Sequence, residues 1–139
     1  MYSYERDVHV YETDLMGIVH HSNYLRFCEE ARVDWCKLKG LLLNKKDNES
    51  QTAVYGLTVY ETRVKHVAPI RYSDRILIKI QAKVEGIRII FQYKILVGEN
   101  IKCLAETVHC NLDLNYKVKR LSPELIKLVE KEIWIETWL

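Results

Sequence analysis

The stretch that decides the fold is Tyr11-Glu12-Thr13-Asp14-Leu15-Met16-Gly17-Ile18-Val19-His20-His21-Ser22-Asn23-Tyr24, which continues directly into residues 25–32. An extended apolar segment ends here at an acid, a turn follows, and a helical pattern then begins. Gly17 is the turn residue that tolerates a positive φ or a close approach of the backbone. This order predicts a carboxylate close to the free N–H groups at the start of a helix.

The long helix is predicted from the spacing of the apolar residues after Ser22. They recur at steps of three and four over about 17 residues, which is the pattern of one buried helix face. The stripe consists of Leu25, Cys28, Ala31, Trp35 and Leu38. Ser22 or Asn23 is the expected N-cap, and Gly40 is the expected C-terminal stop.

The rest of the chain is dominated by patterns typical of β-strands. Strands are expected over residues 4–11, 54–67, 75–84, 87–95 and 101–114, with a polar loop at 41–51 and a short helix that begins at Ser122-Pro123. In the third strand the inward residues are Ile76, Ile78, Ile80, Ala82 and Val84, and the outward residues are Lys79, Gln81 and Lys83. Short turns between consecutive strands predict an antiparallel meander that buries the long helix. The predicted fold class is therefore α+β.

Length and composition limit the class of protein. A chain of 139 residues predicts a single domain, residues 1–139. The net charge of +2 and the scattered basic residues do not indicate nucleic-acid binding. No apolar run reaches the roughly 18 residues of a membrane span. Charged residues follow Met1 where a signal peptide would be apolar. A cytoplasmic location is therefore expected. The four cysteines lack Cys-x-x-Cys spacing and are expected to be reduced.

Asp14 is the first candidate for chemistry, and two interpretations stand beside each other. Asp is common in turns and caps, so the residue could have a purely local role. Alternatively, it acts as a base or nucleophile while neighbouring N–H groups bind a developing oxyanion. A thioester suits that second arrangement, because its leaving thiol has a pKa near roughly 8.5 and needs little acid assistance. No Gly-x-Ser-x-Gly nucleophile motif is present.

The pair His20-His21 raises the question of a metal site. Adjacent histidines in a strand or turn are expected to point apart, and no partner lies at metal-ligand spacing, so neither a metal nor a cofactor is expected. Lining a pocket is the favoured role, with the backbone N–H of His21 more important than its ring. His66 and His109 are expected to be packing or edge residues of strands.

Basic residues on the strands are candidates for phosphate contacts with a nucleotide-bearing substrate. They are Arg63, Lys65, Arg71, Arg75 and Arg88. Arg88, beside the turn at residues 85–86, is the preferred one.

The opening stretch resembles the 4-hydroxybenzoyl-CoA thioesterase family of the hotdog fold, especially its YbgC-like acyl-CoA thioesterase branch. The matching elements are Tyr11, Thr13-Asp14, Gly17-Ile18-Val19, His21, Asn23-Tyr24-Leu25, Glu29 and Ala31-Arg32, with Val67-Ala68-Pro69-Ile70-Arg71-Tyr72-Ser73-Asp74 later in the chain. The resemblance implies a sheet wrapped around one central helix, dimers that pair into tetramers, and coenzyme A at a subunit interface. It also implies Asp14 as nucleophile or general base and the His21 N–H as the oxyanion donor.

Gly17, Ile18, Val19, His20 and Tyr24 are then expected to contact the substrate. The chain departs from the branch's pattern at His20 and at Leu15-Met16, which are expected to reshape the acyl pocket. The predicted function is hydrolysis of an acyl-CoA to a carboxylate and coenzyme A, with an acyl-carrier protein as a second form of the substrate. The alternative is a hotdog module that binds acyl-CoA or a protein without turnover, and a hotdog dehydratase ranks third.

Overall fold

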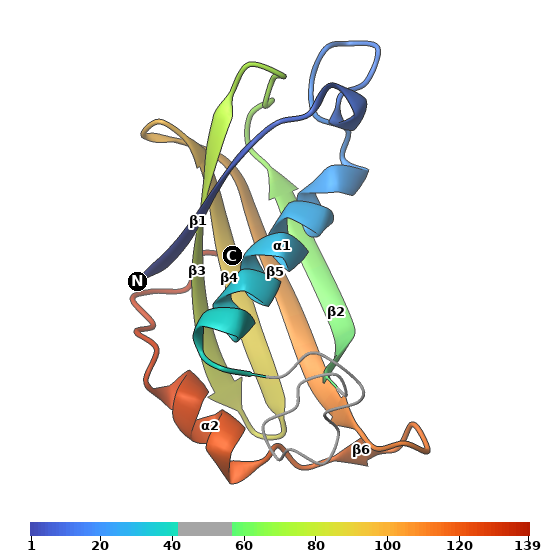
Figure 1. Cartoon of the computed structure of the whole chain (residues 1–139), viewed down its shortest axis with the longest axis vertical. Coiled ribbons are helices and arrows are strands. Elements are labelled where there is room, and N and C mark those ends of the chain that lie inside the picture. The colour runs from blue at the N-terminus through green and yellow to red at the C-terminus, as the bar shows by residue number, and fades with distance from the viewer. Residues whose placement is uncertain (42–56) are drawn as a thin grey trace.

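The structure, a computed structural model, describes residues 1–41 and 57–139, and it is built on one antiparallel sheet. The sheet wraps around a long helix, α1, which lies across its concave face (Figure 1). The strands are β1 (Tyr2–Asp7), β2 (Leu57–His66), β3 (Arg75–Glu85), β4 (Arg88–Val97), β5 (Asn100–Leu112) and β6 (Val118–Lys119). The helices are η1 (Val10–Glu12, a 3-10 turn), α1 (Ser22–Leu38) and α2 (Pro123–Glu130).

The strands follow the order β1-β3-β4-β5-β2, with β6 paired to β5. The hairpins β3–β4 and β4–β5 form the predicted meander, while β1 and β2 lie at the two edges. The predicted class, α+β with an antiparallel sheet around one long central helix, is confirmed. The loop expected at residues 41–51 and the first residues of the strand expected at 54–67 lie largely outside the described residues.

The core lies between α1 and the concave face of the sheet. Phe27, Cys28, Ala31 and Trp35 of α1 are fully or almost fully buried. Trp35 meets Phe91 of β4 edge to face, with 5.4 Å between the ring centroids. Each large apolar side chain buried in this way contributes about 1.5–3 kcal/mol, so the apolar stripe fixes the helix on the sheet.

The bounds of α1 agree with the sequence pattern, but its N-cap differs. Gly40 has φ +73° after the last turn, as expected of a C-terminal stop. The N-cap is His21, with a helical backbone and no side-chain cap, instead of Ser22 or Asn23. Both predicted caps bond elsewhere: the Asn23 amide donates to the Glu12 carbonyl at 2.8 Å, and Ser22 Oγ lies 2.8 Å from His20 Nδ1.

The first strand is shorter than predicted. It ends at Asp7 instead of residue 11, and the chain turns into η1, where Val10 is 64% exposed. Arg6 occupies the inward face and is only 8% exposed. Its guanidinium donates two hydrogen bonds of 2.8 Å to the Glu12 carboxylate. A bidentate ion pair of this kind fixes the path of the chain from β1 into η1. The alternation of polar and apolar residues in the sequence does not predict such a contact between side chains.

The outer face of the sheet is covered by the C-terminal residues 133–139. Gln81 points outward as predicted, yet it is only 1% exposed. Its amide donates to the Glu136 carbonyl at 2.6 Å and accepts from the Ile135 N–H at 3.2 Å. Gln81, Gln92 and Glu106 form a row of buried polar side chains across β3, β4 and β5, called the amide row below. Gln92 also bonds to the backbone of Trp138 and Leu139. The tail is therefore held by buried side-chain amides.

The four cysteines form no disulfide. Cys28, Cys36 and Cys103 are buried, and burial raises the pKa of the Cys36 thiol to about 11 and that of Cys103 to about 12. They act as small apolar core residues. Among residues 1–41 and 57–139, no helix has the length and apolar character needed to cross a membrane.

Replacing Gln92 by Leu tests the amide row on the outer face. Gln92 is fully buried, so Gln92→Leu leaves the Glu106 carboxylate and two backbone groups without one of their partners. We expect a loss of about 2–3 kcal/mol in the free energy of unfolding, measured by urea denaturation. Lys94→Leu, which removes only the cation–π contact with Trp138, serves as the control. Equal free energies of unfolding for Gln92→Leu and Lys94→Leu would contradict the conclusion that the amide row stabilises the fold.

Candidate active site

Asp14 lies in a tight turn that its own side chain holds. Its Oδ1 accepts hydrogen bonds from the Met16 N–H at 2.8 Å and from the Ile18 N–H at 3.5 Å. Gly17 completes the turn with φ +75°, which confirms its predicted role as the residue that allows a positive φ. The second carboxylate oxygen receives no hydrogen bond from the described residues and is available to a ligand.

A second turn in the molecule shows what such an Asp does for structure alone. Asp113 Oδ1 accepts from the Asn115 and Lys117 N–H groups at 2.8 and 3.0 Å, with the same spacing along the chain as at Asp14. The local hydrogen bonds of Asp14 therefore do not by themselves indicate chemistry. What distinguishes Asp14 is its surroundings, because a pocket and a helix N-terminus lie beside it.

The helix N-terminus next to Asp14 offers a free backbone donor. The Ser22 N–H is taken by His20 Nδ1 at 3.2 Å, and the Asn23 N–H by the His20 carbonyl at 3.0 Å. Among the described residues, no acceptor takes the N–H of His21. A free N–H at the positive end of a helix dipole is suited to hold an oxyanion.

Asp14 and His21 line the same pocket, which has a volume of about 430 Å³. Its remaining walls are Ile18, Val19, Tyr24, His66, Val67, Ala68 and Pro69. The two halves of the pocket are joined by backbone hydrogen bonds, because the Val19 N–H donates to the Ile70 carbonyl at 2.8 Å and Ile18 forms a bridge with Arg71. These two contacts, together called the clamp below, hold the Asp14 turn against the segment that links β2 to β3.

The structure brings most of the predicted site residues together. Asp14, Ile18, Val19, His21 and Tyr24 all line the pocket, while Gly17 and His20 lie beside it without contributing to its wall. The rings of His20 and His21 lie 4.2 Å apart, so the expectation that they point apart was wrong. The His20 ring turns back because its Nδ1 bonds to Ser22.

Arg88 is not brought to this pocket. It begins β4 opposite Cys110, whereas His66 of the pocket pairs with Cys103. Seven residues along β5 separate the two positions by roughly 23 Å. The Arg88 guanidinium instead lies over the Tyr60 ring, 4.4 Å from its centroid.

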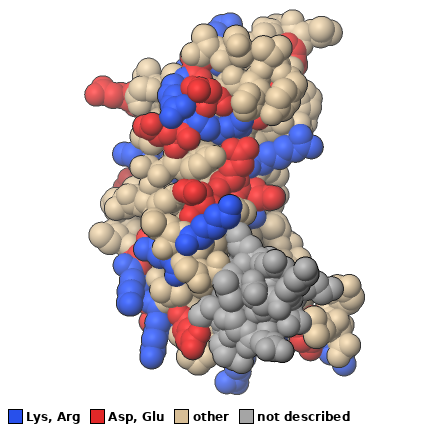
Figure 2. Space-filling model, in the orientation of Figure 1, with Lys and Arg blue, Asp and Glu red and all other residues tan. Residues whose placement is uncertain are grey.

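Arg71 is the basic residue of the candidate set that lies nearest the turn. It is exposed and bridges Ile18 directly. Arg63 and Arg75 are engaged elsewhere, the first with Glu106 and the second with Glu5 and Asp7. Figure 2 shows acidic side chains gathered along the middle of the face that carries α1, where Glu29 and Asp34 are exposed. Arg71 is therefore the member of the candidate set best placed to meet a phosphate group beside this pocket.

His66 is the functional candidate that sequence reasoning assigned to strand packing. It lines the pocket, and the Tyr24 ring meets it edge on with 4.6 Å between centroids. His66 stands at the end of a strand, and the neighbouring residues in the sequence do not indicate that it lines a pocket. Only the contact between two segments far apart in the chain, residues 14–24 and 66–71, puts it in the same pocket as Asp14.

Comparison with known proteins identifies the family of the chain. The family model described as the thioesterase-like superfamily matches residues 8–129. The chain belongs to this superfamily. The predicted enzyme class, a thioester hydrolase of the hotdog fold, is confirmed with it.

Two curated relatives of this thioesterase-like chain span almost its whole length. A protein of Aquifex aeolicus named as a candidate esterase is 30% identical over 128 residues, which cover 91% of this chain and 96% of the relative. A 1,4-dihydroxy-2-naphthoyl-CoA hydrolase of Synechocystis is 26% identical over 126 residues, which cover 88% and 89%.

Solved structures share the fold of this thioesterase-like protein. A 1,4-dihydroxy-2-naphthoyl-CoA thioesterase from Synechocystis superposes with a TM-score of 0.79 at 23% identity, covering 93% of this chain and 95% of that one. A thioesterase from Thermus thermophilus, complexed with coenzyme A and zinc, superposes with a TM-score of 0.77 at 14% identity and covers 92% and 90%.

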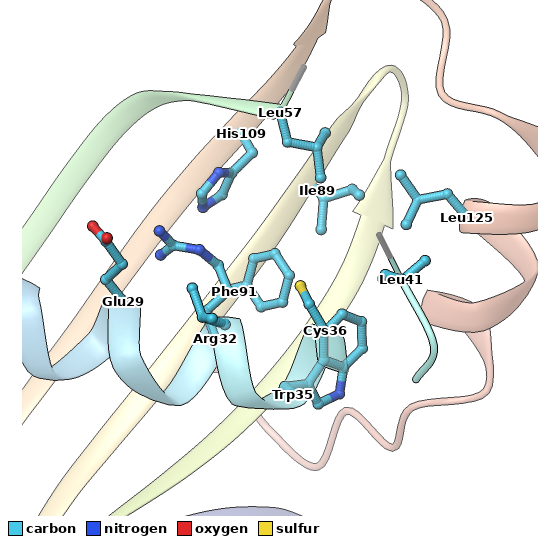
Figure 3. Close-up of a pocket in the computed structure, with 11 residues that line it drawn as sticks. Glu29, Arg32, Trp35, Cys36, Leu41, Leu57, Ile89, Phe91, His109 and Leu125 are labelled. Atoms are coloured by element: carbon cyan, nitrogen blue, oxygen red, sulfur yellow. The ribbon is translucent and has the colours of Figure 1, made fainter. Parts of the chain in front are cut away.

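A second cavity lies deeper, between α1 and the sheet, and has a volume of about 260 Å³. Figure 3 shows the Arg32 guanidinium and the His109 ring facing each other at one end, with Leu41, Ile89 and Leu125 toward the other. His109 is buried as predicted for a packing residue, with 2% exposure. Burial lowers the pKa of its imidazole to about 3, and the neighbouring Arg32 cation acts in the same direction. The ring is therefore neutral at physiological pH.

The neutral His109 predicts a specific sensitivity to acid. Below pH 6.5, the ordinary pKa of histidine, His109 is protonated in the unfolded chain but stays neutral in the folded chain. The free energy of unfolding therefore falls as the pH drops from about 6.5 toward 3. By pH 5 this amounts to about 2 kcal/mol. We expect His109→Gln to lose less free energy of unfolding between pH 7 and pH 5 than the wild type, measured by urea denaturation at each pH. The control His9→Gln changes an exposed histidine, and parallel pH curves for all three proteins would contradict the prediction.

Proposed function

We propose that the protein hydrolyses the thioester of an acyl-CoA and that Asp14 performs the chemistry. The observation that carries this proposal is the presence of an Asp14 carboxylate oxygen and the free His21 N–H in one pocket. In the resemblance to the YbgC-like branch of the 4-hydroxybenzoyl-CoA thioesterases, the same two positions carry the reaction. We propose that branch as the closer assignment within the superfamily.

The proposed reaction begins when the thioester carbonyl oxygen accepts a hydrogen bond from the His21 N–H. Either Asp14 attacks the carbonyl carbon and forms a mixed anhydride that water then hydrolyses, or Asp14 takes a proton from water, which attacks directly. In both routes negative charge grows on the carbonyl oxygen, where the helix N-terminus stabilises it. The sulfur–carbon bond breaks, and coenzyme A leaves as a thiolate. Single-turnover hydrolysis in isotope-labelled water separates the routes, because only the anhydride route can place the label in the Asp14 carboxylate.

An aromatic acyl group is the substrate class we propose. The Synechocystis relative is named for a naphthoyl-CoA substrate, and the Tyr24 and His66 rings form one side of the pocket here. Ring walls of this kind favour a flat aromatic group through offset or edge-on contacts. Of the residues where the stretch departs from its branch, Leu15 and Met16 are exposed beside the pocket, 107% and 78% respectively. They are placed to contact a substrate that enters from outside.

We also propose that the active protein is at least a dimer, formed along the free edge of β2. In the described part of the chain β2 pairs only with β5, and its exposed apolar residues include Val59 and Tyr60. A long open edge of this kind is a template for a strand from a second chain. Because β2 runs into His66 and Val67 of the pocket, a second copy would lie next to the substrate.

That neighbouring copy gives coenzyme A a place at the subunit interface. Arg71 is the phosphate contact we propose from the same chain, and Arg88 can contribute only from another copy. A tetramer of such dimers, an acyl-carrier protein as donor and a cytoplasmic location remain predictions that follow from the resemblance and the composition.

Replacing Asp14 by Asn tests the catalytic assignment. Asn keeps the oxygen that accepts the turn N–H groups but removes the charge, so the fold is retained. We expect kcat to fall by about 100-fold or more with the best aromatic acyl-CoA, measured by release of free thiol. The matched control is Asp113→Asn, which changes a turn of the same geometry and should leave kcat unchanged. An Asp14→Asn protein that retains most of the wild-type rate would rule out the assignment.

The dimer is tested by placing lysines on the β2 edge. Val59→Lys combined with Thr62→Lys puts like charges where two strands would meet, which disfavours edge pairing. We expect the mass measured by light scattering to fall to that of one chain, 16.5 kDa, with loss of thioester hydrolysis. The control, Asn115→Lys with Val118→Lys, changes exposed positions at the β5–β6 hairpin. A wild-type protein that is a fully active monomer would refute the proposal.

A further inference from the structure

The cavity beside Arg32 and His109 is separate from the Asp14 pocket, because no described residue lines both. Most of its wall is apolar and is formed by Trp35, Leu41, Leu57, Ile89, Phe91 and Leu125. Apolar cavities of about 150 Å³ are known to hold benzene. At about 260 Å³, this cavity has room for a molecule of one or two rings.

Arg32 gives the cavity a cationic end. A guanidinium carries five N–H donors and stays charged at every relevant pH. Its one hydrogen-bond partner within the described residues is the Tyr93 hydroxyl, at 2.9 Å, and no carboxylate there lies within ion-pair distance. Arg32 is partly exposed, and the Glu29 carboxylate attracts its charge from beyond ion-pair distance. Donors therefore remain for an anion that enters the cavity.

Two hydroxyl groups and the His109 ring form a chain of polar contacts that begins at Arg32. Tyr93 Oη lies 2.9 Å from Thr107 Oγ1, which in turn lies 2.9 Å from His109 Nε2. Burial raises the pKa of Tyr93 to about 12, so its hydroxyl stays protonated and neutral beside the neutral His109. Glu29 lies one helical turn before Arg32 on the rim of the cavity, and Figure 3 shows its carboxylate at the same end of the cavity as the guanidinium. The two groups attract each other but form no ion pair, so the inner end presents a cation that bonds to the Tyr93 hydroxyl.

We propose that this cavity is a second ligand site, which binds a small aromatic monocarboxylic acid with the carboxylate on Arg32 and the ring among Trp35, Phe91 and Leu125. One cation matches one carboxylate, and the apolar walls match a ring that has little polarity of its own. A phosphate-bearing nucleotide is excluded by its size and by its several charges. The inference does not depend on hydrolysis at Asp14, although hydrolysis of an aromatic acyl-CoA releases an acid of this class.

The test uses 2-naphthoate as the probe and its neutral isostere 2-naphthamide as the comparison, in titration calorimetry with the full chain. We expect saturable binding of 2-naphthoate to the wild type, and binding of the amide at least about tenfold weaker, because the amide lacks the charge. Arg32→Gln should weaken naphthoate binding by about tenfold or more and abolish the preference for the acid. Asp14→Asn should bind naphthoate as the wild type does, which separates this site from the proposed active site.

A second variant keeps the test decisive if Arg32→Gln fails to fold. Cys36→Phe leaves the guanidinium in place and fills part of the cavity, so naphthoate binding should be lost while circular dichroism shows a folded protein. If neither variant folds, the preference of the wild type for the acid over the amide, read together with Trp35 and His109 resonances that shift on binding, decides the matter. The proposal is overturned if 2-naphthoate does not bind, if it binds no better than the amide, or if Asp14→Asn alone abolishes binding.

Discussion

The turn that carries Asp14 depends on backbone hydrogen bonds, one to a distant segment of the chain and one across the turn itself. The Val19 N–H donates to the Ile70 carbonyl, and the His20 N–H donates to the Glu12 carbonyl, which also accepts from the Asn23 side chain. These bonds hold the acid, the start of α1 and the end of β2 around one pocket. Without them Asp14 would be an ordinary turn residue, like Asp113. The proposed division of roles between Asp14 and the His21 N–H therefore rests on the clamp.

The two faces of the sheet solve the problem of burying polar groups in different ways. On the outer face, the side-chain amides of Gln81 and Gln92 bind the backbone of the C-terminal residues. On the inner face, Arg32 keeps a charge beside an apolar cavity, and among the described residues its hydrogen-bond partner is the Tyr93 hydroxyl. A satisfied network stabilises a fold, whereas spare donors next to an empty space indicate a place for a ligand.

Much of the fold could be predicted because local patterns agreed with the final packing. The middle of the predicted helix stripe, from Cys28 to Trp35, and the alternation from Ile76 to Ala82 are buried as expected and identify the faces that meet in the core. Leu25 and Leu38, at the two ends of the predicted stripe, are exposed. The pattern was wrong where a side-chain contact between neighbouring segments overrides it. The Arg6–Glu12 ion pair replaces the end of the first strand with a 3-10 turn, and the bonds of Ser22 and Asn23 to other residues leave His21 as the N-cap.

The sequence by itself determined the α+β class and the position of the central helix, because periodicity and turn chemistry act over a few residues. It offered Asp14 as a candidate, and the resemblance favoured its catalytic role. Only the tertiary structure decided that His66 joins the pocket, that Arg88 lies roughly 23 Å along the sheet from it, and that Arg32 and His109 share a cavity. These outcomes depend on strand register and on how the sheet curves around α1. Register and curvature are properties of pairs of segments far apart in the chain, and no local pattern of residues encodes them.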